Sequence, residues 1–290
     1  MPPVPVIFDE FLLGYRGRIA GLNCLSDPRK VLSADIWEGA MYSTFVEAAA
    51  RVNGISIEQV LIRHTCYPLR DLLGPASTTV PSECSVLTQL SLPTIYDLIA
   101  YCDGCVEEDA ASEHHIAHWR RDHQIPGLLT CPVHTTQLRF VRQSIASCTP
   151  PTVGCPDAVW LSQNQYEAYA RNPHIAVALG FLQELLRANI ALDHRLCVFA
   201  LYQELERQLP NRLPNARDLI QLIRDTYPPG WLDITIPAEN RWHARKAGDW
   251  SFARTTSGIA LAAGLLFPSP AIALARMLPV PAGAPEPAVN

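Results

Sequence analysis

Apolar residues recur at helical spacing near the start of the chain. Residues three and four positions apart face the same side of a helix. The first such stripe consists of Phe8, Leu12, Tyr15 and Ile19. It predicts one helix with a single buried face in the segment 8–19.

Two further helices, joined by a short turn, are predicted within residues 41–68. The apolar face of the first consists of Met41, Phe45, Ala48, Ala49 and Val52. Asn53-Gly54 ends it, and Ser56 with Gln59 three residues later is a capping-box pattern that begins the next helix. Pro68 marks the end of the pair. Two helices joined by so short a turn form a helix-turn-helix.

The outer face of this second helix bears on what the helix-turn-helix binds. A DNA-reading version carries polar or basic residues there. Glu58, Gln59 and Arg63 are a poor set for phosphate. We therefore favour protein–protein packing over sequence-specific DNA reading, with a homodimer as one form of that packing.

The second half of the chain has helical periodicity over most of its length. Ser162 and Gln165 form another capping-box pattern, and the apolar run that begins at Ile175 keeps helical spacing through much of the segment up to Leu209. The loop 147–156 separates this region from the first half. The last residues, 279–290, are rich in Pro and Ala and are expected to be disordered.

Composition narrows the class of protein. The 290 residues are 48% hydrophobic, which is typical of a globular protein, and the net charge of −5 argues against a protein that coats nucleic acid through bulk positive charge. Nine cysteines, an odd number in a long chain, do not suggest a small disulfide scaffold. No signal peptide and no apolar run of membrane-spanning length is recognised. We expect a cytoplasmic protein that does not contact a membrane.

The segment from Tyr101 to His134 carries the clearest chemistry. Cys102 and Cys105 form a C-x-x-C pair, and Cys131 and His134 form a C-x-x-H pair. Zinc prefers four tetrahedral ligands drawn from thiolate and imidazole, and two such pairs supply them. A catalytic zinc usually keeps one position open, so the sequence predicts a structural Zn²⁺ site.

The fourth ligand and the role of zinc remain open at this level. His118 or His123 could replace His134, although only His134 repeats the spacing of the first pair. Glu113 beside such a histidine would suit a zinc hydrolase, which is our second alternative. Cys148 and Cys155 are spaced more widely than a usual zinc pair and are interpreted as loop cysteines.

A few other positions could contact nucleic acid. Trp119 is interpreted as a core residue, while the roles of Arg120 and Arg121 stay undecided. The best candidate basic patch in this acidic chain consists of Arg241, Arg245, Lys246 and Arg254.

Three blocks of the first half resemble the TniQ family of transposition proteins. "HWRRDHQIPGLLTCPVH" resembles the zinc-finger signature of that family. "DEFLLGYRGRIAGLN" is similar to its N-terminal helix, and "VNGISIEQVLIRHTCYPLRDLL" to its helix-turn-helix stretch. The matching positions outside the zinc finger are Glu10, Arg18, Ala20, Asn23, His64, Thr65 and Pro68. Departures include Asp103 where Pro is usual and Thr135 where Gly is usual.

The resemblance implies a function that the residues alone do not. TniQ and TnsD-like proteins are non-enzymatic target-selection factors of DNA transposons. They link a target-recognising element, either DNA or an RNA-guided CRISPR effector, to an AAA+ ATPase and a transposase. A transposon AAA+ ATPase is thus the implied partner, in a bacterial, nucleoid-associated setting. A stand-alone zinc-finger and helix-turn-helix DNA-binding protein is the first alternative.

These observations together predict a mainly α protein. A helix-turn-helix (41–68) and a zinc finger (101–134) form an N-terminal module within a TniQ-like domain, residues 1–147. A helical C-terminal domain, residues 157–278, follows, and then the tail.

Overall fold

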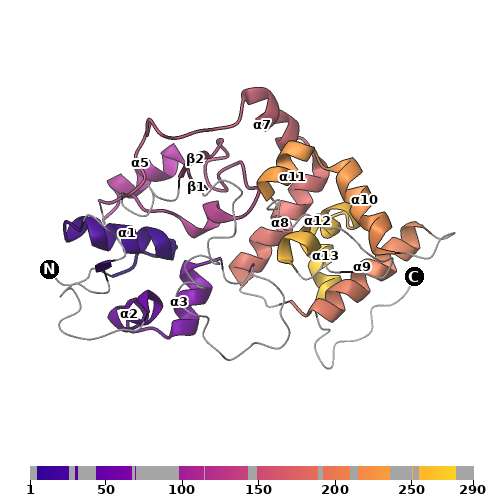
Figure 1. Cartoon of the computed structure of the whole chain (residues 1–290), viewed down its shortest axis with the longest axis horizontal. Coiled ribbons are helices and arrows are strands. Elements are labelled where there is room, and N and C mark those ends of the chain that lie inside the picture. The colour runs from indigo at the N-terminus through magenta and orange to yellow at the C-terminus, as the bar shows by residue number, and fades with distance from the viewer. Residues whose placement is uncertain are drawn as a thin grey trace.

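The computed structural model describes residues 5–25, 30–31, 44–66, 69, 98–113, 115–142, 149–188, 192–209, 215–235, 250 and 255–278. Within these ranges the fold is mainly α, as predicted, with eleven α-helices and one two-stranded sheet. The N-terminal helices α1 to α3 and the C-terminal helices α8 to α13 lie toward opposite ends of the long axis, and the sheet lies between them (Figure 1).

The first helix, α1, spans Leu12–Leu22 and begins later than predicted. Phe8 was expected on its apolar face, but it precedes the helix and is 90% exposed. The cause is a turn at Asp9, whose φ is +62°, followed by Glu10, whose carboxylate accepts a hydrogen bond from the Ile7 amide at 3.0 Å. The apolar stripe was therefore extended one position too far toward the N-terminus.

The two helices predicted next are present. α2 spans Phe45–Val52, and α3 spans Ile57–His64. The capping box is confirmed, because the Ser56 hydroxyl accepts from the Gln59 amide and the Gln59 side chain accepts from the Ser56 amide. Met41 and Pro68 lie outside the described residues. The helix-turn-helix assignment itself stays a prediction.

The sheet was not predicted from the sequence. β1 (Leu98–Tyr101) pairs antiparallel with β2 (Arg139–Arg142), in a register that sets Tyr101 opposite Arg139. Val159 extends β2 by a bridge to Phe140, with both backbone hydrogen bonds at 2.8 Å. On the other edge, the Gln124 amide bonds the N–H and the C=O of Ala100, at 3.0 and 2.9 Å. A side chain thus occupies the place of a neighbouring strand.

The C-terminal region is a helical assembly, as predicted. Its elements are α7 (Gln163–Ala170), α8 (Pro173–Ala188), α9 (His194–Gln208), α10 (Ala216–Thr226), α11 (Pro229–Thr235), α12 (Thr256–Leu266) and α13 (Pro270–Met277). The capping box at Ser162 and Gln165 is confirmed at the start of α7. α12 packs tightly on α8, because a Cβ at Gly264 would lie 2.5 Å from the His174 carbonyl oxygen. Burial of apolar side chains between these helices drives the assembly.

Packing links the two halves across the predicted boundary. The buried core of α8 to α13 continues into Leu128, Leu129 and the cysteines of the C-x-x-C and C-x-x-H pairs. The indole of Trp231 donates a hydrogen bond to the Gly127 carbonyl at 3.0 Å. The domain limits stay a prediction, and the loop before Cys131 is packed between both regions.

Membrane-spanning length was also assessed. Among the described residues no single helix is long and apolar enough to cross a membrane. α12 and α13 pass that criterion only as a pair, which is bent by 118°.

Candidate metal centre

The cysteine and histidine pairs come from two local structures. Cys102 is the N-cap of α5 (Asp103–Ala111), and Cys105 lies in the first turn of that helix. There the helix dipole favours a thiolate. Cys131 and His134 lie on a tight turn, in which the His134 amide donates to the Cys131 sulfur at 3.4 Å and the Thr135 amide to the Cys131 carbonyl at 2.9 Å.

The structure brings all four predicted residues together. Their donor atoms lie within 4.8 Å of one another, and the three cysteines are buried. His134 Nδ1 is 3.6 Å from Cys102 Sγ, 3.3 Å from Cys105 Sγ and 3.7 Å from Cys131 Sγ. The sulfurs of Cys105 and Cys131 are 3.5 Å apart.

These spacings fit a tetrahedral zinc ion. Zn–S and Zn–N bonds of about 2.3 and 2.05 Å give tetrahedral edges of roughly 3.8 Å between sulfurs and roughly 3.6 Å between sulfur and nitrogen. Four of the six donor–donor distances lie within a few tenths of an ångström of these edges, and all six are within 4.8 Å. We conclude that the four donors could bind a metal ion, with the ligand types that zinc prefers.

A glycine and a carboxylate hold the His134 ring in place. A Cβ at Gly104 would lie 2.9 Å from the imidazole, so the ring packs directly on the backbone of α5. One helical turn further along α5, Glu108 Oε1 is 2.9 Å from Nε2 of this ring. A carboxylate in this place favours the proton on Nε2, which leaves Nδ1 free to bind a metal.

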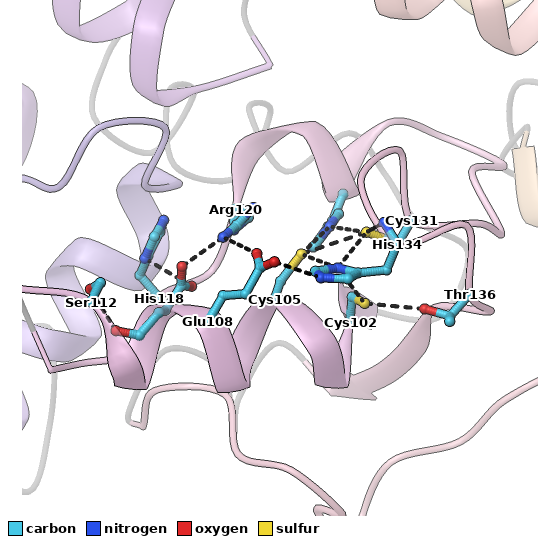
Figure 2. A network of polar contacts seen from close by, with 11 residues as sticks. Cys102, Cys105, Glu108, Ser112, His118, Arg120, Cys131, His134 and Thr136 are labelled. Atoms are coloured by element: carbon cyan, nitrogen blue, oxygen red, sulfur yellow. Dashed lines mark hydrogen bonds and ion pairs between the residues drawn. The ribbon is translucent and has the colours of Figure 1, made fainter.

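The contacts continue along α5 (Figure 2). The Arg120 guanidinium is 3.7 Å from Glu108 and 2.7 Å from Asp109, and Asp109 is 3.1 Å from His118 Nδ1. Asp109 and His118 are both buried. Burial lowers the pKa of His118 despite this carboxylate. Glu108 is therefore held between His134 and the half-buried Arg120, behind which Asp109 and His118 are buried.

Cys105, Cys131 and His134 also affect one another's protonation. The hydrogen bond between the two sulfurs raises the pKa of the Cys105 thiol and lowers that of Cys131. Bonds to Cys131 and then to Glu108 raise the pKa of His134. A thiolate is the form that binds a metal, so between these two sulfurs Cys131 is the one that ionises first.

The competing histidines occupy different places. His118 pairs with Asp109 rather than with the sulfurs. His123 is buried, and its Nε2 lies 3.5 Å from Cys131 Sγ and 3.7 Å from Cys105 Sγ, so it contacts two sulfurs where His134 contacts all three. His134 is accordingly the better-placed fourth donor. Glu113 is exposed at the end of α5.

Other residues singled out in the sequence have structural roles or lie outside the described part. Trp119 is buried, as predicted, and donates to the Thr149 carbonyl at 2.9 Å. Arg121 donates to the carbonyls of Ile62 and Leu186, so it ties α3 and α8 to the segment that carries the Cys/His cluster. Cys155 is half-buried. The basic patch of Arg241, Arg245, Lys246 and Arg254, and likewise Cys148, falls outside the described residues.

The positions shared with the TniQ blocks make a buried network that spacing did not reveal. Glu10 and Arg18 form an ion pair with contacts of 2.6 and 2.8 Å, and both are buried. His64 Nδ1 donates to the Glu10 carbonyl at 3.0 Å, and the Thr65 hydroxyl donates to the Leu61 carbonyl. These residues fix α1 against α3, which explains their type without a ligand.

Thr135, a departure from the TniQ pattern, also has a structural meaning. Its φ is +55°, in the left-handed region that favours glycine. The glycine that is usual there would adopt this conformation without strain, whereas a β-branched residue does not.

Comparison with known protein families gives a match over the part of the chain that holds the Cys/His cluster. The family model TniQ matches residues 4–138, slightly less than half of the chain, a stretch that includes α1 to α3 and the whole Cys/His cluster. No curated protein matches the chain. Residues 4–138 therefore form a region that matches the TniQ family.

Proposed function

We propose that this chain is a non-enzymatic accessory protein of DNA transposition that links target recognition to the transposon AAA+ ATPase. The observation that carries the proposal is the TniQ match over residues 4–138, which ends just beyond the last residue of the Cys/His cluster. TniQ proteins are accessory factors without catalysis. The target-recognising element would be DNA or an RNA-guided effector.

In this proposal Cys102, Cys105, Cys131 and His134 hold a structural Zn²⁺. Such an ion would supply folding free energy to the segment around it. Four protein donors already close the tetrahedron, so no coordination position remains for a substrate or an activated water. This closed donor set favours the adaptor over a zinc hydrolase, in which Glu113 would act beside an open site.

The polar groups around the cluster serve the same structural role. Glu108 orients His134, and Arg120 and Asp109 fix Glu108 from behind. Arg121 and Trp231 connect the loop to the helices on either side. The zinc-bound loop would thereby set the relative position of the N-terminal and C-terminal helices, a frame on which partners could assemble.

The proposal is tested by co-sedimentation of the purified chain with a transposon AAA+ ATPase from the same organism, with and without ATP. We expect ATP-dependent binding that is lost in Cys131→Ser and kept in Cys197→Ser. The matched control is apt because Cys197 is equally buried but lies on α9, outside the cluster.

Two other outcomes would point elsewhere. Tight, salt-sensitive binding to one DNA duplex without any partner, and no binding to the ATPase, would support the stand-alone DNA-binding alternative. Metal-dependent turnover of a hydrolysable substrate would support the hydrolase.

A further inference from the structure

The open edge of the sheet carries an exposed tryptophan. Trp160 is 58% exposed, and its neighbour Val159 is 53% exposed. Large aromatic side chains are seldom left in water without a reason, and Trp is enriched at the centres of protein interfaces. The segment that bears both residues, 158–160, is called the edge segment below.

The register fixes where the Trp160 side chain points. Val159 and Phe140 form a hydrogen-bonded antiparallel pair, so Trp160 lies directly across from Arg139 on the same face. The Arg139 guanidinium lies over the indole ring, 4.9 Å from its centroid, and is 2.5 Å from Asp103 Oδ2. Trp160 is thus held in one orientation although it is exposed.

A pocket opens beside this row of side chains. Its volume is about 320 Å³, and it is lined by Asp103, Gly104, Thr136, Gln137, Leu138, Arg139 and Trp160. That space is enough for one or two side chains of a partner. Because Arg139 is already paired with Asp103, the floor of the pocket carries little net charge.

The backbone of Trp160 is unpaired on the outer side of the edge segment. In an antiparallel pair, residues alternate between facing the partner strand and facing away from it. Val159 faces β2, so the N–H and C=O of Trp160 face away, and neither forms a hydrogen bond within the described part of the chain. Such an edge accepts an extended segment as an additional strand.

The charges around the edge segment select the kind of segment. Glu107 lies one helical turn after Asp103 on α5, on the same face, and is exposed. Asp157 precedes the edge segment and is also exposed. Neither forms an ion pair among the described residues. These acidic side chains disfavour a nucleic acid and favour a peptide that carries Lys or Arg.

We propose that residues 158–160 are a docking site for an extended, basic and apolar segment of a partner protein. The segment pairs with the backbone of Trp160, places an apolar side chain in the pocket beside Trp160 and Arg139, and sets its basic side chains near Glu107 and Asp157. The site adjoins the Cys/His cluster through Gly104 and Thr136, but it uses none of the four donors and does not depend on the identity of the transposition partner.

The test uses a fluorescein-labelled peptide of nine residues in which Lys and Val alternate, titrated with the whole zinc-loaded chain by fluorescence anisotropy. We expect saturable binding below 1 mM, with at least a tenfold loss in Trp160→Ala and a smaller loss in Glu107→Lys. The matched control Phe199→Ala removes an aromatic ring that is 59% exposed on α9 and should change nothing.

Two altered peptides separate the causes of binding. Methylation of alternate backbone nitrogens removes main-chain donors and should abolish binding, and replacement of Lys by Glu should weaken it. The proposal is overturned if the basic peptide does not bind by 1 mM, or if Trp160→Ala or the methylated peptide binds as well as the parent. Trp160-dependent binding of single-stranded oligothymidine, without peptide binding, would also overturn it and assign the surface to nucleic acid.

Discussion

The segment 98–142 and the helices α8 to α13 share an apolar core but differ in what else orders them. The segment 98–142 has one α-helix, one short 3-10 helix and two four-residue strands, and its further fixed points are four donors that could bind a metal and side chains that bond backbone groups. The C-terminal helices are held by a continuous apolar core in which Phe181 and Leu185 are fully buried. The segment 98–142 adds a few specific polar contacts to its apolar burial, whereas the C-terminal helices depend mainly on total buried area.

The difference shows how a segment with little regular secondary structure can take one conformation. Burial of apolar side chains orders the helices, whereas a segment with few helical or strand hydrogen bonds also needs fixed cross-links. The two regions nevertheless touch through Trp231 and Gly127. Damage to one region can therefore be compared with damage to the other in the same molecule.

Removal of the proposed zinc ion should produce the largest difference between the two regions. Structural zinc contributes roughly 10–16 kcal/mol in zinc-finger peptides, which matches the whole stability of a typical domain. We expect Cys131→Ser, or chelation, to expose the amide of Leu138 to hydrogen exchange while Leu182 on α8 stays protected. Cys197→Ser should bind zinc normally by elemental analysis. Equal loss of protection at both amides would show that the two regions fold as one unit.

A cavity in the core of helices α8 to α13 perturbs the other region and leaves the Cys/His cluster intact. Phe181→Ala should lower the free energy of unfolding by about 3–5 kcal/mol, because it removes a fully buried ring. Chemical denaturation followed by circular dichroism measures this change. The zinc content of the folded variant should remain at one ion per chain, and a variant that lost its zinc would contradict the separation of the two regions.

The orientation of His134 offers a finer test. Glu108→Gln removes the carboxylate that contacts Nε2 and should weaken zinc binding by roughly 10- to 100-fold, as for other groups that orient metal ligands. Transfer of zinc to a chromophoric chelator measures the affinity. Glu107→Gln is the neighbouring control, exposed and without a role in the cluster. An equal change in both variants would indicate a general charge effect instead of orientation.

Relief of backbone strain in the metal-binding turn should have the smallest effect, and it should be stabilising. Thr135→Gly permits the positive φ without a Cβ and should raise the stability of the zinc-loaded chain by about 1 kcal/mol. The denaturation midpoint reports the gain. Thr136→Gly is the contrast, because Thr136 Oγ1 lies 3.3 Å from Cys102 Sγ and its removal should destabilise the chain. A loss of stability in Thr135→Gly would show that the positive φ of Thr135 does not strain the backbone.

The sequence predicted those features whose causes are local. Caps at Ser56 and Ser162 depend on residues three positions apart, and both were found. Spacing also identified the two Cys/His pairs, because each pair lies on one turn of chain. Phe8 was misplaced because periodicity continued past the point where Glu10 turns the backbone.

The sequence did not predict features that depend on contacts between residues far apart in the chain. Spacing cannot say which imidazole faces the sulfurs, and His118, His123 and His134 were distinguished only in three dimensions. Glu108 was missed because its partner lies 26 residues away. Strands of four residues give too short a pattern to separate from a loop.

The side chain of Gln124 limits how far this sheet can grow. A sheet with two open edges can add copies without end, as fibres do, whereas closure of one edge leaves room for a single further strand. Gln124 occupies both backbone groups of Ala100. A strand added at Trp160 is therefore the last strand that this protein can add to its sheet. The protein could therefore bind one partner strand at a time at this edge without polymerising through its sheet.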